Sequence, residues 1–198
     1  EDLQFLSTPS MKVVMFYLDT KSDAPLKDKR VRQAIEYAID KEGIVQAVCY
    51  GYGSVAYAIV PDSVTEYKEV KEPHVYNLDK AKKLMKEAGY EDGFSMEIWT
   101  SSVQTNTEIC QVVQEQLAAI NIDAEILVQD ANTIDTRVDA GDEYGLSLHF
   151  YSCNSGHAEY TLSNILPTGT LRNDSRFSNP EYDAAYEEWL VTVDEKKR

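Results

Sequence analysis

The alternation of strand-like and helix-like segments between residues 94 and 151 constrains the fold more than any other feature of this sequence. The strand-like segments are short and rich in apolar residues, whereas the helix-like segments repeat apolar residues at a period near 3.6. We expect strands at residues 94–100, 122–128 and 145–151, and helices at residues 105–120 and 133–140. This order predicts right-handed βαβ units, a largely parallel sheet and hence an α/β fold.

The first half of the chain adds a strand and three helices to this pattern. Met11–Asp19 is rich in β-branched and aromatic residues and is expected to form a strand. Asp28 can cap a helix whose apolar residues repeat on one side, and Asn77 can cap another that Gly89 ends. A shorter helix is expected over Lys41–Tyr50. These elements place helices on both sides of the sheet.

A last helix is expected to begin near residues 178–180, where a capping asparagine precedes a proline. Its inward face is predicted to consist of Tyr182, Tyr186, Trp189 and Val193. The chain stops at residues 194–198 within a helical pattern and carries no leader-like segment at its start. We therefore expect residues 1–198 to be a single lobe excised from a longer protein.

Charge and composition argue against two broad classes of protein, those that bind nucleic acids and those that span a membrane. The chain has 19 basic and 34 acidic residues, a formal net charge of −15, so a nucleic-acid partner is not expected. No run approaches the roughly 18 apolar residues that a membrane-spanning helix needs. Apolar residues make up 43% of the chain, which is ordinary for a globular domain.

Signatures of catalysis, cofactor binding and metal binding are missing from the sequence. There is no GxSxG elbow, no GxxxxGK[ST] loop and no HExxH pair. The cysteines Cys49, Cys110 and Cys153 lie far apart, and His149, within an apolar strand, is expected to be structural. We therefore expect no catalytic residues, no cofactor and no metal site.

Candidate binding residues lie where two of the predicted parallel strands end. In an open α/β sheet, ligands bind beyond the carboxyl ends of the strands. The segments at these ends, 100–102 and 151–157, are small, polar and rich in hydroxyl groups. The candidates that they supply are Thr100, Ser101, Tyr151, Ser152, Asn154 and His157. The alternative, that both segments are ordinary polar loops, remains open at this point.

Three motifs in order resemble the second lobe of family 5 solute-binding proteins. Residues 25–35 (PLKDKRVRQAI) with 37–41 (YAIDK) are similar to the family's first signature. Residues 76–84 (YNLDKAKKL) with 87–90 (EAGY) resemble its second. Residues 177–183 (FSNPEYD), followed by 194–198 (DEKKR), resemble its third. Each motif is also explicable as helix capping and core packing, so together they indicate family and fold better than ligand.

The resemblance implies a periplasmic-binding-protein type II-like lobe, one half of a clamp that closes on its ligand. It further implies an extracytoplasmic location, either periplasmic or lipid-anchored, and a monomer that serves the permease subunits of an ABC importer. Dipeptides or oligopeptides would be the ligands, with their extended backbone bound by main-chain groups. Family members place an acidic ligand contact in a G-D-x-D segment, which corresponds to Gly156–Glu159 here. His157 stands at the first acidic position, and Glu159 is the candidate that could take over the contact with the ligand's ammonium group. Alternatively, the ligand has no free amine, and Glu159 only begins the following helix.

Other functions remain open beside the peptide-binding hypothesis. The same fold could bind a nickel chelate, haem, glutathione or a sugar conjugate. A hydrolase that uses two carboxylates in the same cleft would be an enzyme instead. A protein-interaction domain would expose a large apolar patch in place of a polar cleft edge.

Overall fold

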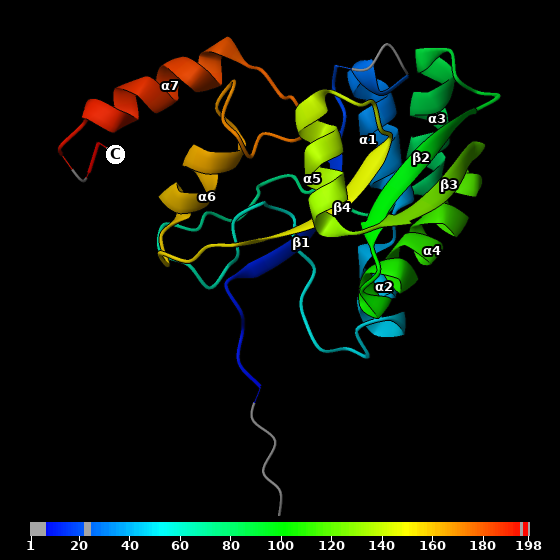
Figure 1. Cartoon of the computed structure of the whole chain (residues 1–198), viewed down its shortest axis with the longest axis horizontal. Helices are drawn as coiled ribbons and strands as arrows, with labels where there is room; N and C mark the ends of the chain where they lie inside the picture. The colour runs from blue at the N-terminus through cyan, green and yellow to red at the C-terminus, as the bar shows by residue number, and fades with distance from the viewer. Residues whose placement is uncertain (1–6, 22–24, 195, 198) are drawn as a thin grey trace, which may run out of the picture.

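The structure is a computed structural model, and it describes residues 7–21, 25–194 and 196–197. Its centre is a four-stranded sheet with the strand order β1-β4-β2-β3 (Figure 1). The strands are β1 (Lys12–Leu18), β2 (Phe94–Ser101), β3 (Ile122–Gln129) and β4 (Leu146–Ser152). β2 runs parallel to both β3 and β4, whereas β1 is antiparallel to β4. The predicted α/β class and mostly parallel sheet are confirmed.

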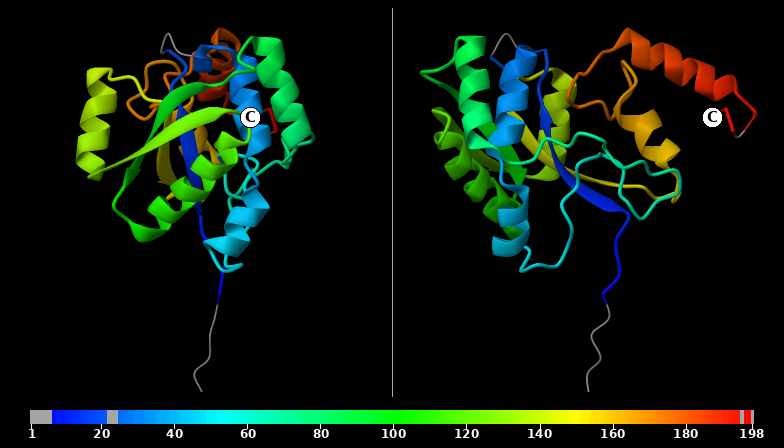
Figure 2. Two further views of the ribbon diagram at one scale, coloured as in Figure 1. Left: turned by 90° about the vertical axis from the view of Figure 1, so that its right-hand side faces the viewer. Right: turned by 180° about the vertical axis from the view of Figure 1, so that it is seen from behind.

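Helices cover both faces of this sheet, as Figures 1 and 2 show. One face packs against α1 (Lys29–Ala38), α3 (Leu78–Ala88) and α4 (Gln104–Ala118). The other face packs against α5 (Ala131–Ala140) and the end of α6 (Ala158–Ile165). The remaining helices are the 3-10 turn η1 (Pro25–Lys27), α2 (Lys41–Ala47) and α7 (Pro180–Val191). The predicted helix over Lys41–Tyr50 is thus three residues shorter than expected.

Local capping explains where several helices begin and end. The Asp28 carboxylate accepts a hydrogen bond from the Arg30 backbone N–H at 2.8 Å at the start of α1. The Asn77 side chain accepts one from the Lys80 N–H at 2.9 Å at the start of α3. Gly89 ends α3 with φ +83°, a left-handed conformation that favours glycine. These caps were expected from the sequence.

The main hydrophobic core lies between the sheet and the helices α1, α3 and α4. It contains fully buried side chains from each of these layers, among them Ile35, Met85, Leu117, Ile98 and Leu146. A smaller cluster on the other face includes Trp99, Tyr17 and Tyr144 from the sheet side, and Ile134, Val138 and Ile165 from the helices. Burial on this scale dominates the free energy of folding.

The C-terminal part of the chain forms an arm that extends from the sheet (Figure 1). Within the described part of the chain, α7 has no buried residue. Its predicted inward face is correct in part, because Tyr182, Tyr186 and Trp189 are half-buried and the last two rings stack. Val193 is wrong: it lies beyond the end of α7 and is 92% exposed. Residues 195 and 198 of the third motif lie outside the described residues.

Candidate ligand-binding site

At the carboxyl edge of the sheet, β4 separates from β2. The two strands pair only at Ile98–Leu146 and Trp99–Ser147. From Leu148 to Ser152, β4 is paired with β1, and no other described residue pairs with its second edge as a strand. Because each residue of an extended strand offers an N–H and a C=O, this edge can bind an extended backbone.

Exposed apolar side chains lie at the same end of the sheet. Val14 and Phe150 are cross-strand partners on β1 and β4, and they are 44% and 59% exposed. They lie on the face that carries α1 and α4 but are left uncovered at this end. The Lys12 ammonium lies 4.0 Å from the centre of the Phe150 ring. Val103 and Val128, near the ends of β2 and β3, are also exposed. Such a surface suits a ligand or a second protein surface.

The segment from the end of β4 to the start of α6 holds most of the predicted binding residues. Tyr151 is half-buried and its ring lies 5.8 Å from that of Tyr160. Burial is the main cause that raises the pKa of Tyr151 to about 12, so its hydroxyl stays protonated at neutral pH. Ser152 ends β4 opposite Lys12, and Asn154 is exposed in the following turn. This segment therefore brings together aromatic, hydroxyl and amide groups.

The carboxylate of Glu66, far away in the sequence, contacts this segment at His157 and Ala158. We call this set of contacts the Glu66–His157 clasp. The His157 Nδ1 lies 3.2 Å from one Glu66 carboxylate oxygen, and the Ala158 N–H donates to the other at 3.3 Å. A short parallel bridge between Thr65 and His157 places the two segments side by side. Nothing in the local sequence signals this contact, because 91 residues separate its partners. Sequence reasoning missed Glu66 for that reason.

The other predicted binding residues differ in their surroundings. Glu159 is exposed in the first turn of α6. Ser101 ends β2, where its hydroxyl accepts a hydrogen bond from the Asn106 amide at 2.9 Å. Thr100 is fully buried on the side of the sheet that faces Cys110. The structure therefore gives no support for Thr100 as a ligand contact and separates Ser101, on the β2 side, from the β4–α6 segment.

The groups predicted to be structural are bonded within the protein. The His149 Nε2 lies 2.7 Å from the Ser147 hydroxyl, and its ring packs edge-on against Tyr17. Burial lowers the pKa of His149, which keeps the imidazole neutral at physiological pH. Cys110 and Cys153 are buried and Cys49 is half-buried, all three as free thiols. The prediction of a structural His149 is confirmed.

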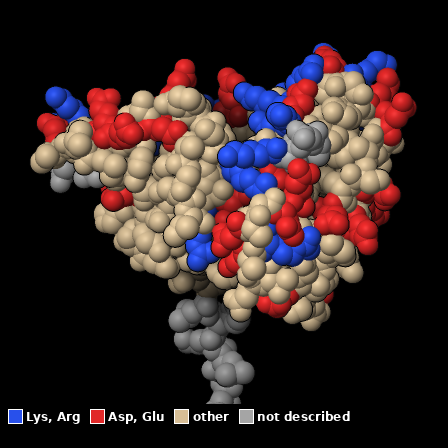
Figure 3. Space-filling view, turned by 45° about the horizontal axis from the view of Figure 1, so that its top comes forward, with Lys and Arg blue, Asp and Glu red and all other residues tan. Residues whose placement is uncertain are grey.

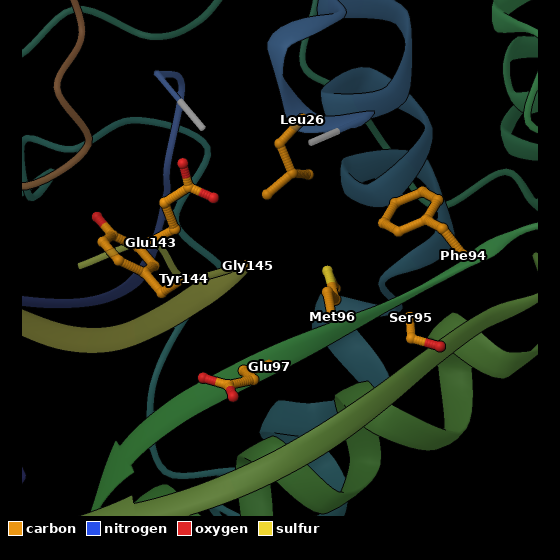
Figure 4. A pocket seen from close by; sticks show the side chains of 8 residues that line it. All are labelled: Leu26, Phe94, Ser95, Met96, Glu97, Glu143, Tyr144 and Gly145. Atoms are coloured by element: carbon orange, nitrogen blue, oxygen red, sulfur yellow. The ribbon is translucent and has the colours of Figure 1, made fainter. Parts of the chain in front are cut away.

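Two small hollows lie elsewhere. One of about 150 Å³ lies at the amino ends of β2 and β4, where Phe94, Met96 and Tyr144 line it (Figure 4). The other, of about 280 Å³, lies beside the start of α2. The described residues include no group of three or more side chains able to hold a metal ion. Nor does any helix among them have the length and apolar character that crossing a membrane requires.

Acidic and basic side chains are interspersed on the face shown in Figure 3, and the projecting arm carries mostly acidic ones. Those on α7 include Glu181, Asp183, Glu187 and Glu188. Basic side chains gather near the middle of that face, beside acidic ones. The exclusion of nucleic acid, which rests on the net charge, stays a prediction.

Comparison with known proteins gives consistent matches along the whole chain. The model of "Bacterial extracellular solute-binding proteins, family 5 Middle" matches residues 1–172. The glutathione-binding protein GsiB of Salmonella paratyphi A is 30% identical over 208 residues, which cover 100% of this chain and 40% of that protein. The chain therefore spans about two fifths of the length of this relative.

Solved structures of other proteins have the same fold as this chain. HbpA2 from Haemophilus parasuis superposes with a TM-score of 0.89 at 26% identity, covering 97% of this chain and 39% of that one. A dipeptide-binding protein from a Pseudoalteromonas species, in complex with Met-Leu, superposes with a TM-score of 0.85 at 28% identity. The match covers 95% of this chain and 38% of that protein. The expected periplasmic-binding-protein type II-like architecture is confirmed.

Proposed function

Because this chain belongs to the bacterial extracellular solute-binding proteins of family 5, we propose that it is a ligand-binding lobe for small peptides. In the longer protein, a second lobe would close over the ligand, and the complex would deliver it to the permease subunits of an ABC importer. The protein would act outside the cytoplasm as a monomer, either free or lipid-anchored. It would bind its ligand without transforming it.

One observation carries the proposal: the opening between β4 and β2 at the carboxyl edge of the sheet. It offers an unpaired strand edge from Leu148 to Ser152 for an extended backbone. The uncovered apolar side chains Val14 and Phe150 lie on β1 and β4, and polar groups up to Glu159 follow in the segment after β4. Apolar area with a few placed polar groups is what a binding site for small ligands requires.

The proposed contact residues are Tyr151, Ser152, Asn154, His157 and Glu159, with Ser101 on the β2 side. Glu159 and the clasp carboxylate Glu66 would give the β4–α6 segment a negative charge that favours a ligand ammonium group. Thr100 is left out because its side chain is fully buried. Each of these contacts is a proposal that ligand titration can test.

Glutathione is a second candidate ligand, because a similar protein bears the name glutathione-binding protein. Glutathione has two carboxylates and one ammonium group, so it is a net anion at neutral pH. The chain itself has a net charge of −15, and Glu66 and Glu159 lie in the proposed site. Electrostatic complementarity therefore favours a zwitterionic dipeptide or tripeptide over glutathione.

Ligand titration monitored by NMR chemical shifts tests the proposal on this chain. Met-Leu and trialanine are expected to perturb residues 148–160 most, with millimolar dissociation constants. The reason is that a lobe supplying half of a binding free energy of roughly 8 kcal/mol retains about 4 kcal/mol, which corresponds to a millimolar dissociation constant. Glutathione is expected to bind more weakly than trialanine. Equal micromolar affinity for this chain and for the longer protein would refute the one-lobe interpretation.

A control separates binding at the carboxyl edge from binding elsewhere. Phe150→Ala should weaken trialanine binding, because this ring is exposed at the proposed site. Phe94→Ala, at the hollow at the other end of the sheet, should leave it unchanged. Perturbations centred on Phe94 and Met96 would instead place the site in that hollow. Turnover of a peptide or a chromogenic glycoside would establish the alternative of a carboxylate-dependent hydrolase.

A further inference from the structure

The Glu66–His157 clasp is built by the backbone as well as by its side chains. The Thr65 N–H donates to the Gly156 carbonyl at 2.9 Å, and the Ala158 N–H donates to the Thr65 carbonyl at 3.1 Å. These bonds bring residue 66 to the first turn of α6. Glu66 has φ +66°, a left-handed conformation that is unusual for a residue with a side chain. The tertiary contacts of this segment therefore hold Glu66 in a conformation that it would rarely adopt alone.

Both oxygens of the Glu66 carboxylate are used in this position. One accepts from the Ala158 backbone N–H, and the other faces the His157 Nδ1 at 3.2 Å. An ionised carboxylate can only accept hydrogen bonds. The hydrogen in this contact must therefore belong to His157 Nδ1. In the neutral imidazole, the other nitrogen, Nε2, is then a hydrogen-bond acceptor.

We propose that Glu66 is a positioning residue that fixes His157 in the Nδ1–H form and directs an acceptor nitrogen, Nε2, toward the ligand. Within the part of the chain that the structure describes, Nε2 has no hydrogen-bond partner, and the His157 side chain is 55% exposed. The site would therefore select a ligand group that donates N–H or O–H at this point. This inference rests on the proposed function, because it assigns the ligand as the partner of Nε2.

The pair differs in chemistry from a single carboxylate. When His157 is neutral, the pair carries one negative charge, which lies on Glu66, and the atom that accepts from the ligand is a ring nitrogen. Glu159, in the first turn of α6, is exposed on the same segment. A neutral donor such as an amide N–H can thus bind His157 while a cationic group remains available to Glu159. The clasp would thereby direct a neutral donor of the ligand to His157 and its cationic group to Glu159.

The tautomer of His157 can be measured without any ligand. Two-bond and three-bond nitrogen–proton correlation spectra of the ¹⁵N-labelled chain distinguish the Nδ1–H from the Nε2–H form at pH above about 8, where an ordinary imidazole is neutral. His157 is expected to be mainly Nδ1–H in the unsubstituted chain. In Glu66→Gln it should shift to a mixture, because the Gln amide can both donate and accept.

The chain supplies a matched control for this measurement. The His74 Nδ1 lies 2.6 Å from a Glu36 carboxylate oxygen, so His74 should also be mainly Nδ1–H. Glu36→Gln should change His74 and leave His157 as it was, and Glu66→Gln should do the reverse. Unchanged core resonances would show that each variant remains folded. An Nε2–H form of His157 in the unsubstituted chain, or no response to Glu66→Gln, would overturn the positioning role.

Trialanine titration then tests the ligand part separately. Loss of one correctly oriented hydrogen bond should weaken trialanine binding roughly threefold to tenfold in Glu66→Gln, and Glu36→Gln should not weaken it. Equal binding to the unsubstituted chain and Glu66→Gln, despite a changed tautomer, would overturn the assignment of Nε2 to the ligand. If trialanine bound neither this chain nor the longer protein, the proposed function would fail and the assignment of Nε2 with it, while the tautomer would still decide the positioning role.

Discussion

The sheet with α1, α3 and α4 and the outer part of the C-terminal arm, residues 167–191, are stabilised by different interactions. The sheet region buries complete side chains from every element, among them Val31, Met85 and Leu117. In the arm, α7 has no buried residue, and its contacts include two hydrogen bonds between Thr168 and the Asp183 carboxylate. The Tyr182 hydroxyl adds a hydrogen bond to the Leu162 carbonyl at 2.9 Å.

Polar contacts also join the arm to the sheet. The Arg176 guanidinium lies 3.5 Å from the Asp19 carboxylate, which is fully buried, and donates to the Asp142 carbonyl. The Thr20 N–H donates to the Ser175 carbonyl at 3.1 Å. Hydrophobic burial is cooperative and spread over many residues, whereas a few polar contacts can break locally. The comparison therefore predicts global unfolding of the sheet region and local opening of the arm.

The largest expected effect comes from the core of the sheet region. Leu117→Ala, at a fully buried position on α4, should lower the free energy of unfolding by about 4 kcal/mol, because it removes apolar area and leaves a cavity. Urea denaturation followed by circular dichroism measures this change. Leu190→Ala, at an exposed position on α7, should change it by less than about 0.5 kcal/mol. Similar losses in both variants would abolish the distinction between the two regions.

The next largest effect is expected where the arm meets the sheet. Arg176→Met keeps much of the side-chain volume but leaves the Asp19 carboxylate buried without its partner, which should cost about 2–3 kcal/mol. Hydrogen exchange should accelerate in residues 166–178 more than in β2. Adding Asp19→Asn should restore part of the stability, and the double-mutant cycle reports the coupling. Strict additivity of the two substitutions would show that the ion pair contributes nothing.

A smaller effect is expected from pH. Burial, followed by the nearby Asp135 and Asp139 carboxylates, raises the pKa of Asp174 to about 6, against the attractive effect of Arg172. The folded state then binds the proton more tightly than the unfolded state, so this contribution to stability is complete below about pH 4 and is lost as pH rises toward 6. Because Asp174 is partly exposed, the effect should be only about 1–2 kcal/mol.

Asp174→Asn removes this dependence. As pH rises from 4.5 to 7.5, the free energy of unfolding of the variant should increase relative to that of the unsubstituted chain. Urea denaturation at the two pH values measures this difference. A constant difference between the two proteins over that range would show that Asp174 titrates as it does in the unfolded chain.

The smallest expected effects come from two equivalent caps. Asn77 caps α3 within the sheet region, and Asn179 caps α7 in the arm, each through its side-chain oxygen. Asn77→Ala should lower the free energy of global unfolding by about 1 kcal/mol. Asn179→Ala should instead increase hydrogen exchange in α7 with less than about 0.5 kcal/mol of global change. Equal global losses would mean that α7 unfolds together with the sheet.

The same two regions differ in how well the sequence predicts them. The caps at Asp28 and Asn77, the ending at Gly89 and the five elements between residues 94 and 152 depend on neighbouring residues, so local patterns predict them. The antiparallel pairing of β1 with β4 joins segments about 130 residues apart, and local patterns carry no information about it. The family resemblance rests on helical motifs and therefore identified the fold rather than the site.

For the candidate site residues, the sequence predicts a position in the fold where topology determines it, but not where it depends on distant contacts. Tyr151, Ser152 and Asn154 lie at the end of β4, as the strand pattern indicated. Thr100 lies within β2 with its side chain fully buried, an orientation that the polar character of residues 100–102 did not indicate. Glu66 had no signal, since its role comes from a contact with a segment 91 residues away. Their assignment as ligand contacts stays a prediction.

The two residue pairs that join β4 to β2 have a mechanical consequence. The sheet is in effect two ribbons, β2–β3 and β1–β4, joined by a short seam at Ile98–Leu146 and Trp99–Ser147. β4 continues into α6, and α7 follows it at the far end of the arm (Figure 2). A small twist of the β1–β4 ribbon about this seam would act as a lever, because the displacement grows with distance from the pivot. Little sheet pairing would have to break for such a twist, so the packing of Ile165 in the cluster that contains Trp99 would supply most of the resistance to it.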